Sequence, residues 1–305
     1  MNTITRTSLK ELLESSQPPT LIDVAPPEYY HAAHLPGAKN CCVYEVAFLD
    51  QANAAVPDKS APIVVYGSSS HSLASATAQE KLTRAGYTRV HDYRGGLDDW
   101  THAGLPVERG PQPPAPEQPR LGRHEIDTAK SQVLWTGRNI NGAHIGIIRL
   151  KSGWLDVADA CDTAHGKAAS GQFTLDMDSI ANTDLADTVL NRVLIAHLKS
   201  DDFFDTALFP TATFLLRHII FNPHAKPGNI NADIDGALTL KGITEDLAFP
   251  ALIEGLSGGA LSAEAHFDID RTRWNVIYGS GKFYEHLGQH LVHDLISLSV
   301  HIVTR

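Results

Sequence analysis

Two different spacings of apolar residues divide this chain. In the first part, short uninterrupted apolar runs at 20–24, 62–67 and 89–93 alternate with helix-like stretches at 8–15 and 73–86. Buried strands that form continuous apolar runs, with helices between them, are typical of a parallel sheet covered on both faces. The pattern therefore predicts an α/β domain at 1–110, a parallel sheet with flanking helices.

In the later part of the chain, apolar and polar residues alternate with period two. This alternation covers 171–179, 230–240, 261–270 and 297–303, and one stretch with helical spacing, 185–198, interrupts it. Many strands with one apolar face each predict an all-β domain, either a closed antiparallel barrel or a sandwich, which periodicity does not distinguish. The inward positions start at Ile230 on one strand, and seven of them are candidate ligand contacts: Phe173, Leu175, Leu238, Phe249, Phe267, Ile269 and Val300.

A proline-rich segment separates the two patterns. Five prolines lie between Pro111 and Pro119. Such a run favours polyproline II, which acts as a semi-rigid spacer. We therefore expect domains at 1–110 and 121–305, joined by a linker at 111–120.

Composition narrows the function classes. The chain has 305 residues and a net charge of −10, which argues against binding to nucleic acid or to anionic lipid. No stretch resembles a signal peptide or a membrane span. Cys41, Cys42 and Cys161 are too few for a disulfide framework, so a reducing, cytoplasmic location is expected.

The loop that follows the apolar run 62–66 is a candidate active site, because a small-residue loop at a helix start presents free backbone N–H groups. It lacks the second glycine of a Gly-x-Ser-x-Gly nucleophile elbow, which disfavours serine-hydrolase chemistry. The loop consists of Gly67, Ser68, Ser69, Ser70, His71 and Ser72.

Three stretches of the first domain resemble the rhodanese, or sulfurtransferase, family: "LIDVAPPEYYHAAHLPGA", the loop itself and "HDYRGGLDDWTHAGLPVE". The resemblance implies a persulfide-carrying cysteine at the position of Gly67. It also implies an arginine at Ala25 and, in members with a longer loop, a second cysteine at Ser72. Since all three side chains differ, we expect no catalytic residue here, and we expect Cys41 and Cys42 to be core thiols.

The second domain resembles the YceI-like family of polyisoprenoid-binding, lipocalin-like proteins. The stretches that carry this resemblance are "EIDTAKSQVLWTGRNINGAHIGIIRLKSGWL", "HLKSDDFFDTALFPTATF", "DGALTLKGIT" and "FDIDRTRWNVIYGSGKFYEHLG". It implies a barrel with an isoprenoid-type lipid inside, lined by the seven inward residues. Many members are exported, whereas this sequence shows no export signal.

Several histidines are alternative site residues. His286, His290 and His293 have the spacing of a metal-binding helix face, but Gly288 and the family pattern indicate a loop, where they would not converge. His144 is expected at the barrel mouth, at the wall or on the surface. We therefore expect no metal ion and no cofactor other than a bound lipid.

These observations predict a non-enzymatic carrier or sensor of an isoprenoid-type or other long-chain lipid. Its rhodanese-like domain would be an inactive docking or regulatory module that could bind a protein partner. The alternatives are a sulfurtransferase that uses another thiol, and an interaction scaffold that binds no ligand in either domain. The sequence leaves open the oligomeric state, the identity of the lipid, the role of the rhodanese-like domain, and whether the barrel is hollow or filled by its own side chains.

Overall fold

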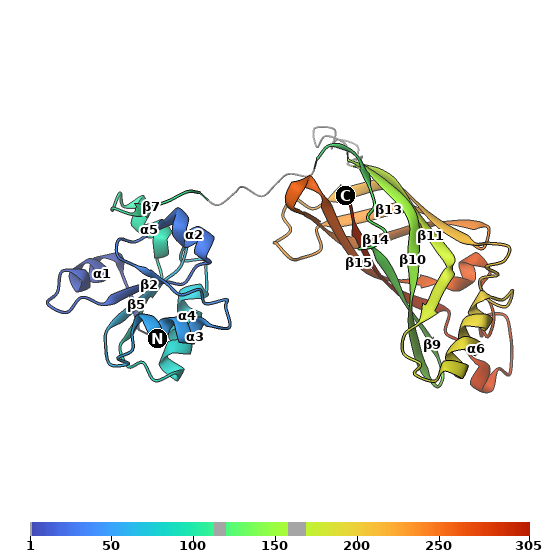
Figure 1. Ribbon diagram of the computed structural model, residues 1–305, viewed down its shortest axis with the longest axis horizontal. Coiled ribbons are helices and arrows are strands. Elements are labelled where there is room, and N and C mark those ends of the chain that lie inside the picture. Colours follow the sequence, from blue (N-terminus) through green and yellow to red (C-terminus); the bar gives the residue numbers. More distant parts are fainter. Residues whose placement is uncertain (1, 113–119, 158–168) are drawn as a thin grey trace. The chain divides into compact units, whose positions relative to one another are not determined.

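The computed structural model describes residues 2–112, 120–157 and 169–305, and the chain divides into two compact units, 1–115 and 116–305. Residues 113–119 of the expected linker, and Cys161, lie outside the described residues. Figure 1 labels the elements of both units.

The first unit is built on a five-stranded sheet in the order β1-β6-β5-β2-β4, and all its neighbouring strands are parallel. The central strands are buried on both faces, as their continuous apolar runs predict. The strands of this sheet are β1 Thr3–Ile4, β2 Thr20–Asp23, β4 Lys39–Asn40, β5 Ile63–Tyr66 and β6 Val90–Tyr93. A small antiparallel pair joins β3 Ala33–His34 to β7 Glu108–Arg109.

Helices cover both faces of this sheet. The helices are α1 Arg6–Leu13, α2 Pro27–Ala32, α3 Phe48–Ala55, α4 Ala74–Arg84 and α5 Gly96–His102. Residues of α3 and α4 pack into one core with Val65, and residues of α1 and α5 pack into another with Val64. This arrangement confirms the predicted α/β domain.

The second unit is a closed antiparallel barrel, which settles the choice between barrel and sandwich. Eight strands, β9 to β16, pair in sequence order, and β16 pairs with β9 to close the ring. A short ninth strand, β8, pairs with residues 154–157 at the C-terminal end of β10. The strands are β8 Gly122–Glu125, β9 Gln132–Asn139, β10 Gly142–Val157, β11 Ala169–Asn182, β12 Thr211–Phe221, β13 Ala232–Leu240, β14 Ile243–Gly255, β15 Leu261–Asp270 and β16 Leu295–Val303.

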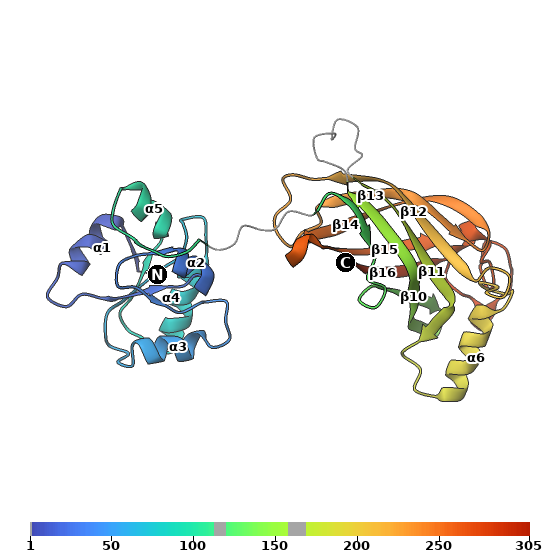
Figure 2. The same ribbon diagram turned by 45° about the horizontal axis from the view of Figure 1, so that its top comes forward.

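One α-helix of the barrel unit, α6 Thr188–Lys199, lies in the connection between β11 and β12, as the apolar spacing predicts. Asp187 caps it by accepting hydrogen bonds from the backbone N–H groups of Val189 and Leu190. The helix packs against β11 (Figures 1 and 2). Short 3₁₀ helices lie at Ser257–Gly259, Arg271–Trp274 and Gly288–His290.

Alternating residues of the strands point into the barrel and form two adjoining clusters. The expectation that Ile230 belongs to this inner row is wrong, because β13 begins only at Ala232 and Ile230 is 59% exposed. The alternation in the sequence therefore begins two residues before strand β13 does. Among the described residues, no helix is both long and apolar enough to cross a bilayer.

Candidate functional site

The barrel interior contains two adjoining cavities. The first, the apolar cavity, has a volume of about 270 Å³ and reaches Val157 and Phe221 at one end of the barrel. The second, the mixed cavity, has a volume of about 310 Å³ and reaches Asn139 and α6 at the other end. The linings share four residues, Val133, Leu175, Leu238 and Leu298. The two cavities therefore follow one another along the barrel.

The structure brings the seven predicted ligand contacts together around these cavities. Six of them line the apolar cavity: Phe173, Leu175, Leu238, Phe249, Phe267 and Val300. The seventh, Ile269, lines the mixed cavity, to which Leu175 and Leu238 also belong. Six of the seven lie in the stretches of period-two alternation, because in a barrel every second residue faces inward, whereas Phe249 lies outside those stretches.

Several of these inward side chains are only half-buried. Phe173, Phe249, Phe267 and Val300 keep accessible surface, although they point away from the outer solvent and line the apolar cavity. A packed core would cover such rings completely, since protein interiors are as dense as organic crystals. Their remaining surface therefore faces the cavity.

Four phenylalanine rings form a continuous belt on the wall of the apolar cavity. Phe249 and Phe267 stack with centroids 4.0 Å apart, and Phe214 and Phe173 extend the row. On β13, between the strands of Phe214 and Phe249, stands Gly236, where a Cβ would come within 2.4 Å of the Phe214 ring. Phe214 was not among the predicted ligand contacts, although the alternation Ala212, Phe214, Leu216 indicates that it faces inward.

The other end of the barrel is partly polar. The mixed cavity includes Tyr278, Gln289, His290 and His293 in its lining, together with His197 of α6. The segment 276–293 is held by Arg271, which is fully buried and donates to the backbone carbonyls of Val276, Tyr278, Val292 and His293. Burial lowers the pKa of Arg271, opposed by Asp294 at 3.8 Å.

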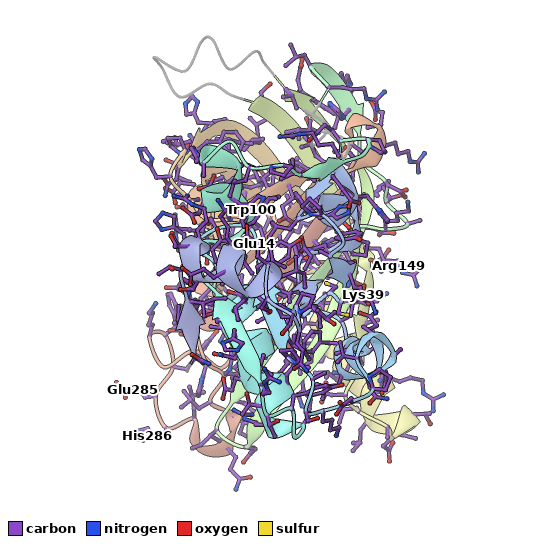
Figure 3. All side chains as sticks on the ribbon, turned by 90° about the vertical axis from the view of Figure 1, so that its left-hand side faces the viewer. Glu14, Lys39, Trp100, Arg149, Glu285 and His286 are labelled. Carbon is purple, nitrogen blue, oxygen red and sulfur yellow. The ribbon has the colours of Figure 1, made fainter. Side chains whose placement is uncertain are left out.

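Two histidines that line the mixed cavity, His144 and His197, pair with carboxylates. His144 lies at the wall of the mixed cavity, and its Nδ1 is 3.0 Å from Asp184, which ties β10 to the segment before α6. His286 is at the exposed tip of its loop, next to Glu285 (Figure 3). Within residues 2–112, 120–157 and 169–305, no three His, Cys, Asp or Glu side chains gather as metal ligands would.

In the first unit, the loop Gly67 to Ser72 leaves the carboxyl end of β5 and leads into α4, as predicted. Gly67 and Ser72 line a surface pocket of about 660 Å³. The close contact of this loop with α5 depends on Gly96, which has φ +65° and whose Cβ would come within 2.5 Å of the Gly67 carbonyl oxygen. The backbone of the loop is therefore held against the start of α5, where the Leu97 and Asp98 N–H groups donate to the carbonyls of Gly67 and Ser68.

The pocket floor carries a carboxyl group and no thiol. Asp23 is only 2% exposed, and burial raises its pKa although the Ala25 N–H and the Tyr66 hydroxyl donate to it. Cys41 and Cys42 are buried, as predicted, and neither is part of the pocket lining. Burial raises the pKa of the Cys41 thiol to about 11. At neutral pH Cys41 is therefore protonated and a poor nucleophile.

Family comparisons match both units. The model of the YceI-like domain matches residues 124–304, and the model of the rhodanese-like domain matches residues 5–103. Among curated proteins, the chain is 34% identical over 107 residues to the HTH-type transcriptional regulator Rv0324 of Mycobacterium tuberculosis. That match covers 35% of this chain and 45% of the regulator, so the chain spans less than half of that relative.

Solved structures resemble each unit separately. BcnA of Burkholderia cenocepacia is 26% identical, with a TM-score of 0.43, over 59% of this chain and 99% of that one. A polyisoprenoid-binding domain from Saccharophagus degradans is 14% identical, with a TM-score of 0.42, over 61% and 99%. The Alr3790 protein from Anabaena sp. is 30% identical, with a TM-score of 0.32, over 35% and 80%. Because the YceI-like match covers more than half of the chain, the protein belongs to the YceI-like family, with a rhodanese-like domain preceding its YceI-like barrel.

Proposed function

We propose that the protein is a non-enzymatic carrier of an isoprenoid-type or other long-chain lipid, which its barrel holds in the two cavities. The observation that carries this proposal is the surface that inward-facing rings such as Phe249 and Phe267 keep toward the apolar cavity. Each CH₂ group that a ligand buries there contributes about 0.8 kcal/mol. A long hydrocarbon chain can therefore bind tightly without any charged contact.

The rhodanese-like domain serves, in this proposal, as an inactive docking or regulatory module. Gly67 stands where the family resemblance implies the sulfur-carrying cysteine, and a glycine has no atom that could carry sulfur. A sulfurtransferase using Cys41 or Cys42 is disfavoured, because both thiols are buried in the core and neither reaches the pocket.

Phe267→Arg tests the carrier proposal. A long cation at this position would project into the apolar cavity and reach water only when no lipid occupies it. We expect the variant to fold and to lose co-purifying lipid in native mass spectrometry of the freshly purified full chain. The matched control is His266→Arg on the outer face of the same strand, which should retain the lipid.

A packed core would respond differently to the same change. There Phe267→Arg would bury an unpaired charge, at a cost of several kcal/mol against a total domain stability of about 5–15 kcal/mol. An unfolded variant by circular dichroism, together with wild-type protein that carries no lipid and takes up none, would refute the carrier proposal.

A further inference from the structure

The outward face of α6 carries a row of exposed apolar side chains. Val189, Leu190 and Val193 are 57%, 57% and 61% exposed, and the exposed Ala196 continues the row. Their spacing of i, i+1, i+4 and i+7 places them on one side of the helix. The helix projects from the strands of the barrel unit (Figure 2), and this side, the outer surface of α6, faces solvent.

Neither packing nor helix stability accounts for the outer surface of α6. The inner side of the helix already supplies the packing, because Leu194 and Leu198 pack into the barrel core and line the mixed cavity. Valine is also a poorer helix former than Glu, Lys or Gln, so an exposed helix position gains no stability from it. In α4, a helix of similar length, the exposed positions are polar or charged: Thr77, Glu80, Thr83 and Arg84. The row on α6 is therefore suited to contact with another apolar surface.

The size of the outer surface favours a bilayer over a protein partner. A stable protein interface takes about 20–30 residues from each side, whereas the outer surface of α6 consists of four side chains. A bilayer sets no such minimum, because a single helix can bury one apolar side at the boundary between the headgroups and the acyl chains.

The charges on and beside α6 favour zwitterionic headgroups. Anionic membrane surfaces are typically bound by clusters of ~4–8 Lys or Arg side chains. The basic residues of α6 are Arg192 and Lys199, and the Lys199 ammonium lies 3.6 Å from the Asp178 carboxylate. Asp184 and Asp187 directly precede the helix and balance this positive charge. A zwitterionic phospholipid such as phosphatidylcholine matches a surface with both signs of charge.

We propose that the outer surface of α6 docks the barrel on a zwitterionic phospholipid bilayer, with Val189, Leu190 and Val193 inserted below the headgroups. This inference rests on the proposed carrier function and adds the face at which the carrier meets its membrane. The inner side of the same helix lines the mixed cavity, so docking places the bilayer about 10 Å, the width of one helix, from the barrel interior. A lipid exchanged at this end crosses less water than one exchanged at the far end.

The test is flotation of the full chain with vesicles of phosphatidylcholine. We expect the wild type to float with the vesicles, and addition of phosphatidylserine should not increase the bound fraction. In the triple variant Val189→Gln/Leu190→Gln/Val193→Gln, binding should fall at least about 10-fold, because three side chains lose their burial in the bilayer. Glutamine favours helix more than valine does, so α6 should still form, which circular dichroism checks. The single variant Val193→Gln should weaken binding in the same direction and serves if the triple variant unfolds.

The matched control is Ile220→Gln/Ile230→Gln. These two isoleucines are 57% and 59% exposed and lie next to the paired residues Phe221 and Ala232, at the end of the barrel that the apolar cavity reaches. The control should float like the wild type. An equal loss of flotation in the control and in the α6 variants would overturn the assignment of the docking surface to α6.

Native mass spectrometry of the same samples separates docking from lipid carriage. The triple variant should keep the co-purifying lipid of the wild type, since its substitutions lie outside both cavity linings. A wild type that carries lipid but does not float would overturn the docking and leave the carrier function intact. A wild type that carries no lipid and takes up none would instead overturn the carrier function. Flotation only with phosphatidylserine, or a dimer in analytical ultracentrifugation that the triple variant dissociates, would overturn the zwitterionic bilayer as the partner of α6.

Discussion

At the residue scale, Gly67 stands where the family resemblance implies the sulfur-carrying cysteine, although the loop around it still joins β5 to α4. A Cβ at this position would lie 3.5 Å from the Ala74 Cβ and 3.8 Å from the Ser75 backbone nitrogen, which are ordinary contact distances. The position therefore has room for a side chain. It also lies at the N-terminus of α4, where backbone N–H groups and the helix dipole stabilise an anion.

Gly67→Cys should consequently produce a thiol of low pKa. We expect it to be alkylated by iodoacetamide below pH 7, because the thiolate is stabilised by the start of α4. Ser70→Cys, at an exposed position of the same loop, is the matched control and should have an ordinary thiol pKa near ~8.5. Both variants are made with Cys161→Ser, so that the signal comes from the new thiol. An ordinary pKa for both would show that the loop no longer stabilises an anion.

At the scale of elements, one buried side chain, Arg271, makes four hydrogen bonds to the segment 276–293. The guanidinium of Arg271 reaches four carbonyls of this segment because its donors are fixed in a planar fork. An ammonium group presents its donors from one point and cannot reach all of them. The segment that closes the mixed cavity is therefore positioned by the geometry of arginine as well as by its charge.

Arg271→Lys should lower the free energy of unfolding by about 3 kcal/mol, since buried carbonyls lose their partners. Urea unfolding monitored by circular dichroism measures this loss, and lipid retention should fall with it. The control is Arg273→Lys at an exposed ion pair with Glu245, which should cost less than about 1 kcal/mol. Equal losses in the two variants would mean that Arg271 does not hold the segment.

At the scale of the whole molecule, ligand binding in the barrel and sulfur transfer in the first unit would require different side chains to be accessible. The barrel needs accessible apolar surface inside, whereas a sulfurtransferase needs an accessible thiolate. Within the described residues, the two cysteines are 1% and 4% exposed. The described residues thus combine an accessible apolar barrel interior with two thiols, Cys41 and Cys42, that are shielded from substrates.

A thiosulfate-to-cyanide assay on the purified full chain should accordingly show no turnover above the buffer rate. The physical reason is that thiolate, and not thiol, attacks thiosulfate, and burial holds the pKa of Cys41 at about 11. Turnover that disappears in Cys41→Ser or Cys42→Ser would restore the sulfurtransferase alternative.

Most of the fold could be predicted from local patterns. The strands β2, β5 and β6 and the helix α4 lie within a few residues of their expected positions, because continuous apolar runs and helical spacing are properties of neighbouring residues. The same holds for the inward row of Phe173, Phe249 and Phe267. The β-bulge in strand β12 was not predicted from the sequence. A bulge after Leu216 turns Ile219 inward instead of His218, and such a register shift leaves no signal in the alternation.

The sequence by itself determined most of the inward-facing residues where the strands are regular, that residue 67 has no side chain to carry sulfur, and which stretch is rich in proline. Only the tertiary structure decided that β16 pairs with β9 to close the barrel, and that the interior is divided into an apolar and a mixed cavity. The polar groups of the mixed cavity come from β9, β10, α6 and the segment 276–293, which are separated by many residues along the chain. Cavity volume is the difference between the space that a closed barrel encloses and the volume of all side chains that enter it. No local pattern contains that difference, because every strand contributes to it at once.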